Sequence, residues 1–254
     1  MIESNWNLLT IESSLAGMPL GWVQFFASTT STNDLASRLA DEGAPDLSLV
    51  VAGQQTAGKG RAGRKWFSPP DASIAMSLVL RLPLETARRC NANHLLLRYT
   101  ALGALAVSDA LQALYQLKPE IKWPNDVLLE GRKVCGVLAE AHWLGNQLES
   151  IILGIGINIF PPSVPPESKL LFPAACIQDY LIQEVSRLDL LHQIMDRILA
   201  WRPQIESPAF IQAWEARLAF RQQWVSITTQ IDNSNMSLIQ GKVEGLDTNG
   251  GLLL

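Results

Sequence analysis

The sequence predicts an α+β or mixed α/β fold for one large domain, followed by a small β module. Three observations support this class: strand and helix periodicities occur in separate segments, two strand segments are joined by a tight hairpin turn, and the helices do not follow a regular βαβ repeat. The chain has 254 residues, 48% of them hydrophobic, which is enough for a sizeable core. We expect the domains to span residues 1–220 and 221–254.

Four segments are predicted to be helices. Residues 31–43 begin with hydroxyl and amide side chains and end at a glycine, and these residue types are preferred at the two ends of a helix. We therefore expect the first hydroxyl residues to cap this helix. Apolar residues at helical spacing predict a long core helix over residues 93–117. The segments 186–201 and 207–219 complete the large domain.

Strand periodicity marks the remaining core segments. Residues 47–52 form a mainly apolar run that predicts a buried strand. Residues 73–81 predict a second strand, in which Ile74, Met76, Leu78 and Leu80 lie on one face. Residues 121–130 and 134–140 are predicted to form a hairpin whose turn is Glu-Gly. A further strand over residues 148–154 leads into a glycine-containing motif.

The composition changes near the end of the chain. Short β-type runs over residues 224–229, 236–243 and 251–254 are separated by Asp-Asn and Asn-Gly turns. This pattern predicts a small β module.

Charge and cysteine content indicate the class of protein. The net charge is −4, so a general affinity for nucleic acid is not expected. Cys90, Cys135 and Cys176 are well separated, which favours reduced thiols over a disulfide framework or a zinc site. The chain opens without a secretory leader, and its apolar runs are too short or interrupted to span a membrane. We expect a cytoplasmic protein with no membrane partner.

The segment from Gly53 to Pro70 concentrates positive charge on an acidic background. It carries Lys59, Arg61, Arg64 and Lys65 among four glycines. Glycines let backbone N–H groups approach a ligand closely, and the cations add charge-assisted donors. The segment nearly matches a Walker A loop, but glycine stands where that motif needs Ser or Thr. We expect a short loop that binds an anionic ligand.

Four motifs in sequence order resemble those of the biotin–protein ligase family. They are Ser31-Thr-Asn33, the loop Gly58–Trp66, the block Lys122-Trp-Pro-Asn-Asp126 with the downstream segment Arg132–Gly136, and Gly154-Ile-Gly-Ile-Asn158. The resemblance covers residues 28–160. It implies a class II synthetase-like catalytic domain, in which helices pack on a mixed sheet, and an SH3-like C-terminal β domain.

The resemblance also implies roles for single residues. Two would be catalytic, Lys133 and Arg61. The residues around biotin would be Ser31, Thr32, Asn33, Gln55, Gly58, Lys59, Arg61, Lys133 and Gly136. The residues around the nucleotide would be Arg61, Arg64, Trp66, Asn125, Lys133 and Asn158. Asp126 is a candidate for holding magnesium with ATP.

The activity implied is ATP-dependent activation of biotin as biotinoyl-5'-AMP and its transfer to a lysine of a biotin carboxyl carrier protein. Acyl-adenylate formation needs no nucleophilic side chain, and the sequence offers neither a Ser-His-Asp nor a Cys-His arrangement. Two alternatives stay open. One is a lipoate–protein ligase or octanoyltransferase, some of which use a cysteine nucleophile, and the other is a non-enzymatic nucleotide- or nucleic-acid-binding module.

The two ends of the chain differ from many members of that family. About thirty residues precede Ser31, too few for a helix-turn-helix domain, so we expect no DNA partner. The chain stops at Leu254, where relatives usually continue, so the small β domain looks truncated. An exposed strand would allow a homodimer, but no residue pattern commits to one.

Overall fold

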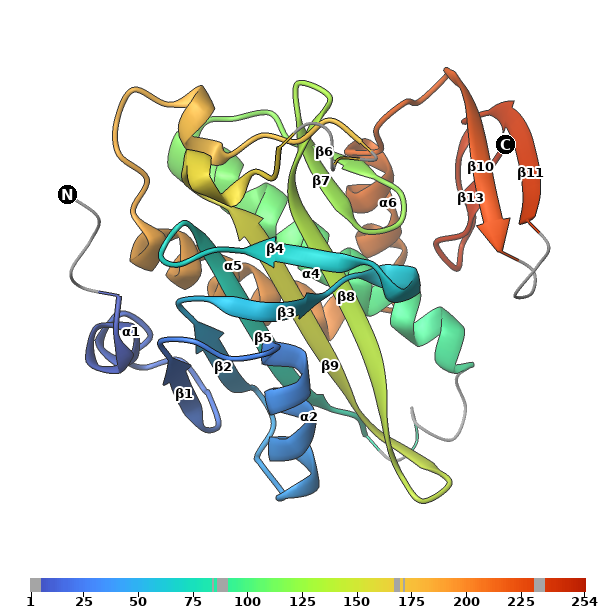
Figure 1. Cartoon of the computed structure of the whole chain (residues 1–254). Helices are drawn as coiled ribbons and strands as arrows, with labels where there is room; N and C mark the ends of the chain where they lie inside the picture. Colours follow the sequence, from blue (N-terminus) through green and yellow to red (C-terminus); the bar gives the residue numbers. More distant parts are fainter. Residues whose placement is uncertain (1–5, 84, 86–90, 167–169, 171, 231–235) are drawn as a thin grey trace.

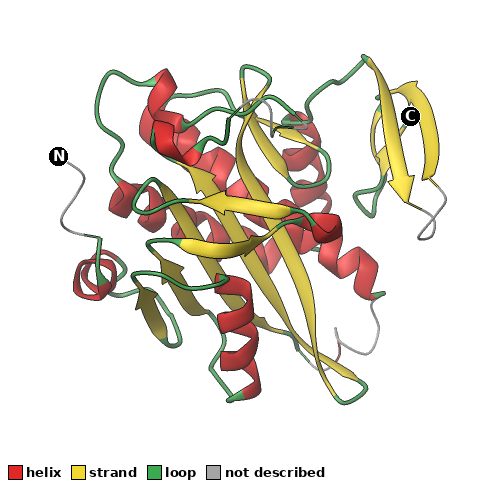
Figure 2. Ribbon diagram, viewed as in Figure 1, coloured by secondary structure: helices red, strands yellow, loops and turns green. Residues whose placement is uncertain are grey.

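A seven-stranded mixed sheet forms the centre of the molecule (Figures 1 and 2). The computed structural model describes residues 6–83, 85, 91–166, 170, 172–230 and 236–254. The strand order is β1-β2-β5-β9-β8-β7-β6. The pair β1–β2 is parallel and the other pairs are antiparallel. The strands are β1 (Val23–Phe26), β2 (Ser48–Ala52), β5 (Ser73–Arg81), β6 (Glu120–Lys122), β7 (Asp126–Leu129), β8 (Arg132–Leu144) and β9 (Gln147–Asn158).

Helices cover both faces of this sheet. They are α1 (Leu8–Ser14), α2 (Thr32–Asp41), α4 (Ala92–Tyr115), α5 (Arg187–Trp201) and α6 (Pro208–Ala216). The long helix α4 packs on β8 and β9 with α5 beside it, whereas α2 lies on the opposite face (Figure 1). A Cβ at Gly103 of α4 would lie 2.8 Å from Val137, so glycine lets this helix approach the sheet closely. The α+β class with a mixed sheet is therefore confirmed.

The alternation of β5 divides the core into two parts. Ile74, Met76 and Leu78 are fully buried in the main core on the α4 side. Val79 points the other way, into the smaller core under α2. Apolar burial on both faces holds this strand at the centre of the sheet.

Several predicted segments agree with the structure, and others differ for a physical reason. The helices predicted at 31–43, 93–117 and 186–201 correspond to α2, α4 and α5, and Gly43 has φ +82° just after α2. The predicted strand 121–130 is instead interrupted by a turn over residues 123–125, which separates β6 from β7, because a proline has no N–H to donate to a strand ladder. The sequence analysis also missed α1 and β1, two short elements at the edge of the fold.

The glycine-rich segment is not an irregular loop. It forms a hairpin of β3 (Gln55–Lys59) and β4 (Lys65–Ser68), with a 3₁₀ turn at Arg61–Gly63 between them. The hairpin lies across the α2 side of the sheet (Figure 1). Strand pairing satisfies backbone groups that an isolated loop would leave to water or ligand, so the loop prediction was wrong in its local structure.

The end of the chain forms two small antiparallel sheets beside α6. The strands are β10 (Trp224–Gln230), β11 (Met236–Lys242), β12 (Gly245–Leu246) and β13 (Leu252–Leu253). Trp123 Nε1 donates to the Gly250 carbonyl at 2.9 Å, and Arg98 donates to the Thr248 carbonyl at 2.8 Å. These bonds tie the turn before β13 to the body of the molecule. The division of the chain at residue 220 stays a prediction.

In the part of the chain that the structure describes, no helix has both the length and the apolar character needed to cross a membrane.

Gly250→Ala is expected to destabilise the protein more than the same substitution at another glycine with a similar φ. Gly250 has φ +87°, and its added Cβ would lie 2.5 Å from the fully buried Trp214 ring. The matched control is Gly43→Ala, with φ +82° and no atom within 4 Å of the new Cβ. We expect a loss of about 1–2 kcal/mol in the control from the left-handed backbone. Gly250→Ala should lower the free energy of unfolding by about 1–3 kcal/mol more than the control, because the added methyl group overpacks the core. Urea unfolding measures both, and equal losses would contradict the clash.

Candidate active site

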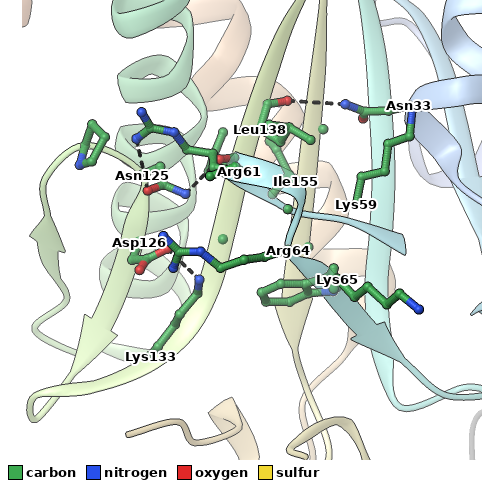
Figure 3. A pocket seen from close by; sticks show the side chains of 18 of the residues that line it. Asn33, Lys59, Arg61, Arg64, Lys65, Asn125, Asp126, Lys133, Leu138 and Ile155 are labelled. Carbon is green, nitrogen blue, oxygen red and sulfur yellow. Dashed lines mark hydrogen bonds and ion pairs between the residues drawn. The ribbon is translucent and has the colours of Figure 1, made fainter. Parts of the chain in front are cut away.

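A cavity of about 660 Å³ lies on the α2 side of the sheet. Its walls come from the start of α2, the hairpin β3–β4, the turn between β6 and β7, the middle of β8 and β9, and β10. Segments far apart in the sequence therefore meet at one place. Figure 3 shows the side chains that line it.

The structure brings most of the predicted site residues together. Those that line the cavity are Ser31, Thr32, Asn33, Gln55, Lys59, Arg61, Arg64, Trp66, Asn125, Asp126, Lys133 and Gly136. Two do not line it. Gly58 lies under Trp66, where a Cβ would be 2.7 Å from the Trp66 carbonyl oxygen. Asn158 is 4% exposed and donates from Nδ2 to the Ala175 carbonyl.

Positive charge is concentrated around Asp126 at one end of the cavity, whereas Lys59 lies beside Asn33 (Figure 3). The cationic side chains that line it are Lys59, Arg61, Arg64, Lys65, Lys122 and Lys133. Asp126 is the single carboxylate among the lining residues. Desolvation by burial lowers the pKa of Arg61, although the negative charge of Asp126 acts in the opposite direction. An anionic ligand would relieve the mutual repulsion of these cations.

Asp126 connects two of the lysines. Its carboxylate lies 2.6 Å from Lys133 Nζ and 3.3 Å from Lys122 Nζ, and Figure 3 shows Lys133 and Asp126 pointing toward one another. Asp126 is only 7% exposed, and the two ammonium groups offset the cost of its burial. Within the described residues, no group of three or more His, Cys, Asp or Glu side chains could hold a metal ion.

The turn between β6 and β7 holds Asn125 against the sheet. Asn125 Nδ2 donates to the Val137 carbonyl at 3.1 Å, and the Val137 N–H donates to the Asn125 carbonyl at 3.0 Å. Arg61 Nη1 donates to Asn125 Oδ1 at 3.5 Å (Figure 3). The tip of the hairpin is thereby joined to the turn across the cavity.

Trp66 lies flat against two glycines of the sheet. An added Cβ would be 2.9 Å from its ring at Gly136 and 2.5 Å at Gly156. Lys133 Nζ lies 5.4 Å from the centre of the same ring. Gly136 thus makes room for the Trp66 ring, in addition to its predicted place in the cavity wall. The Gly-x-Gly-x-Asn motif is regular β9 strand, so its glycines provide space on the sheet rather than a phosphate-binding turn.

Neutral polar groups form the other end of the cavity. Thr32 N–H and Thr32 Oγ1 both donate to Gln55 Oε1, at 2.8 and 3.1 Å. Ser31 is the residue before α2, but its side chain makes no capping bond, so the predicted capping role of Ser31 was wrong. Gln55 satisfies the helix end instead, and the Ser31 hydroxyl is free for other contacts at the cavity wall.

Some lining residues were not predicted from the sequence. Lys122 and Trp123 belong to a motif that had been recognised, but neither was assigned to the site. Ser226–Thr228 of β10 also line the cavity. No sequence signal pointed to them, because the position of a terminal hairpin depends on how it docks.

Comparison with known proteins gives consistent matches. Residues 25–158 match the model of the biotin/lipoate A/B protein ligase family. The chain is 31% identical to the bifunctional ligase/repressor BirA of Bacillus spizizenii over 228 residues, which cover 89% of this chain and 66% of that relative, slightly less than two thirds of its length. It is 32% identical to the biotin–[acetyl-CoA-carboxylase] ligase of Paracoccus denitrificans, covering 90% of this chain and 92% of that protein.

Solved structures share the fold. The biotin protein ligase from Aquifex aeolicus in complex with biotin and ATP aligns with a TM-score of 0.74 at 26% identity, covering 92% of this chain and 91% of that one. The biotin protein ligase from Leishmania major in complex with biotinyl-5-AMP aligns with a TM-score of 0.61 at 21% identity, covering 89% and 98%.

Gly156→Ala is expected to displace Trp66 and open the hairpin β3–β4. The added Cβ would lie 2.5 Å from the ring, and β9 is fixed between two strands, so the ring must move. Trypsin cleavage between Lys59 and Lys65 should accelerate about tenfold, the effect of about 1.4 kcal/mol on local opening. The control is Gly60→Ala in the same hairpin, whose Cβ would come no closer than 3.4 Å to its neighbours. Unchanged cleavage in Gly156→Ala would show that Trp66 does not anchor the hairpin.

Proposed function

The chain belongs to the biotin/lipoate A/B protein ligase family, and from this premise we propose that it is a biotin ligase. It activates biotin with ATP as biotinoyl-5'-AMP and transfers the biotinoyl group to a lysine of a biotin carboxyl carrier protein. One observation carries the proposal: a single cavity has a neutral polar end at Thr32 and Gln55 and a cationic end around Lys133. Biotin with ATP has the same distribution of charge.

In the first step the biotin carboxylate attacks the α-phosphorus of ATP and pyrophosphate leaves. Two anions must approach each other, so the barrier falls when fixed cations neutralise them. We assign Lys133 to the position between the carboxylate and the α-phosphate, because it lies between the hairpin and the β6–β7 turn. Arg61 and Arg64 would hold the phosphates from the hairpin.

Magnesium would be held partly by the nucleotide. Asp126 supplies one carboxylate, and Mg²⁺ usually binds through one or two carboxylates together with substrate phosphates. When bound, the ion would add to the charge neutralisation at the phosphates. Asp126 would hold the ion in this assignment, and Lys122 and Lys133, which both contact this carboxylate, would lie near the phosphates.

In the second step the ε-amine of the acceptor lysine attacks the acyl carbon, and AMP leaves. The acceptor would be the carrier protein of a biotin-dependent carboxylase, because the Paracoccus relative is named for acetyl-CoA carboxylase. A cytoplasmic location and a homodimer stay predictions.

The alternatives have less support. An octanoyltransferase that uses a cysteine nucleophile would need a reactive thiol, but Cys135 is fully buried and burial raises the pKa of its thiol. A module that binds nucleic acid would present an open basic surface, whereas these cations line a cavity. A lipoate ligase is distinguished from a biotin ligase by testing which of the two acids forms the acyl-adenylate.

Lys133→Ala is expected to lower the rate of biotinoyl-AMP formation about 10²–10³-fold, because it removes one cation from the transition state. The fold should persist, since Asp126 keeps Lys122 at 3.3 Å. Mass spectrometry of the acyl-adenylate measures this, with biotin and with lipoate as substrates, and Lys118→Ala on the surface is the control. Absence of biotinoyl-AMP with the unmodified protein would refute the proposed function. A fully active Lys133→Ala variant would remove only Lys133 from the mechanism.

Arg61→Gly is expected to release biotinoyl-AMP and to biotinylate lysines of bystander proteins. Arg61 joins the hairpin tip to Asn125 across the cavity, so its loss opens a route for the mixed anhydride to leave. Streptavidin blotting of an added bystander such as serum albumin measures the effect, with Arg221→Gly as a control outside the cavity. Biotin confined to the carrier protein in Arg61→Gly would show that this arginine does not retain the intermediate.

A further inference from the structure

A chain of hydrogen bonds runs beneath the neutral end of the cavity from Glu140 to Gln55. Asn33 Nδ2 donates to Glu140 Oε2 at 2.6 Å, and Asn33 Oδ1 lies 2.6 Å from Ser77 Oγ. Ser77 Oγ is also 2.8 Å from Thr32 Oγ1, which in turn is 3.1 Å from Gln55 Oε1. Ser77 is fully buried, and neither Ser77 nor Glu140 lines the cavity.

The hydrogen bonds between Glu140 and Ser77 have a fixed donor-to-acceptor direction. The Glu140 carboxylate can only accept, so the Asn33 amide turns its Nδ2 group toward Glu140 and its oxygen toward Ser77. An amide oxygen also only accepts, so the Ser77 hydroxyl donates its one proton to Asn33 Oδ1. Asn33 also donates to the Leu138 carbonyl at 3.5 Å (Figure 3). Both Nδ2 protons of Asn33 and one lone pair of its oxygen are therefore engaged by the protein.

The second half fixes Thr32 as an acceptor toward the cavity. The Thr32 backbone N–H can only donate, so it holds Gln55 with the oxygen inward at 2.8 Å. The Thr32 hydroxyl donates its one proton to Gln55 Oε1 at 3.1 Å. Toward any group in the cavity this hydroxyl can therefore only accept. A ligand group beside Thr32 must therefore donate.

We propose that Ser77 and Glu140 are positioning residues that set the hydrogen-bonding direction of the ureido end of the biotin site. Glu140 orients Asn33, and Ser77 links Asn33 to Thr32, so that the cavity accepts a ring N–H at Thr32. This inference rests on the proposed function and adds two residues outside the cavity to it. A cyclic urea or amide with its N–H toward Thr32 would bind, and a ring with an acceptor at that point would not.

Gly154 provides the space for this arrangement. A Cβ at Gly154 would lie 2.1 Å from Asn33 Oδ1, a separation that no side chain could occupy. The glycine of β9 therefore lets Asn33 lie directly on the sheet between Ser77 of β5 and Glu140 of β8. The three strands are neighbours in the sheet, so the network spans them without a gap.

The test measures biotin affinity by titration calorimetry for Ser77→Ala and Glu140→Gln. Each variant should weaken biotin binding about tenfold, because the direction of the chain is no longer enforced. The KM for ATP should stay unchanged. In an Asn33→Ala background Glu140→Gln should not weaken binding further, since Glu140 acts through Asn33. The control is Ser108→Ala, which removes an equally buried hydroxyl bonded within α4.

A second pair of variants separates hydrogen-bond direction from packing. Asn33→Asp alone places two carboxylates in contact and should abolish measurable biotin binding. Adding Glu140→Gln supplies a donor to the new carboxylate, which still accepts from Ser77, and should restore binding to within about tenfold of the unmodified protein. Biotin affinity unchanged in Ser77→Ala and Glu140→Gln, or no recovery in the double variant, would overturn the inference. If the unmodified protein neither binds biotin nor forms biotinoyl-AMP, the proposed function itself fails.

Discussion

Side chains from two separate segments lie directly against the backbone of β8 and β9, at positions where glycine leaves the sheet bare. Asn33 rests on Gly154, and Trp66 rests on Gly136 and Gly156. A methyl group at Gly154 or Gly156 would come within 2.5 Å of the packed side chain, closer than Cβ atoms approach their neighbours. This steric condition fixes how near α2 and the hairpin can come to the sheet. The shape of the cavity depends on it.

The position of the hairpin then determines the electrostatics. With Trp66 held on the sheet, the 3₁₀ turn projects Arg61 over the cavity toward Asn125. The end of β3 next to this turn is tied to α2 by the ion pair of Lys59 with Asp34. The hydrogen bond to Asp34 raises the pKa of Lys59. Cations from the hairpin and from the sheet thus face each other around one carboxylate. Their repulsion favours an anionic ligand between them.

The cis-proline turn links the cavity to the end of the chain. Trp123 bonds to the Gly250 carbonyl on one side, and two residues later Asn125 bonds to β8 and the hairpin. Gly250 in turn leaves room for the buried Trp214 of α6. The same docking brings Ser226–Thr228 to the cavity wall. The docked turn and the cationic end of the site are therefore connected by a few hydrogen bonds.

The sequence by itself determined the α+β class, the approximate extent of α2, α4 and α5, and many of the polar residues from which the cavity is built. Helix periodicity and caps are local properties, and the motifs keep chemistry-bearing residues at fixed spacings. The tertiary structure alone decided the direction of side chains and the partners of the glycine-rich segment. Asn33 faces Ser77 and Glu140, Asn158 bonds Ala175 away from the cavity, and a segment predicted as a loop became a hairpin. Each outcome depends on residues from distant strands, whose contacts no local pattern encodes.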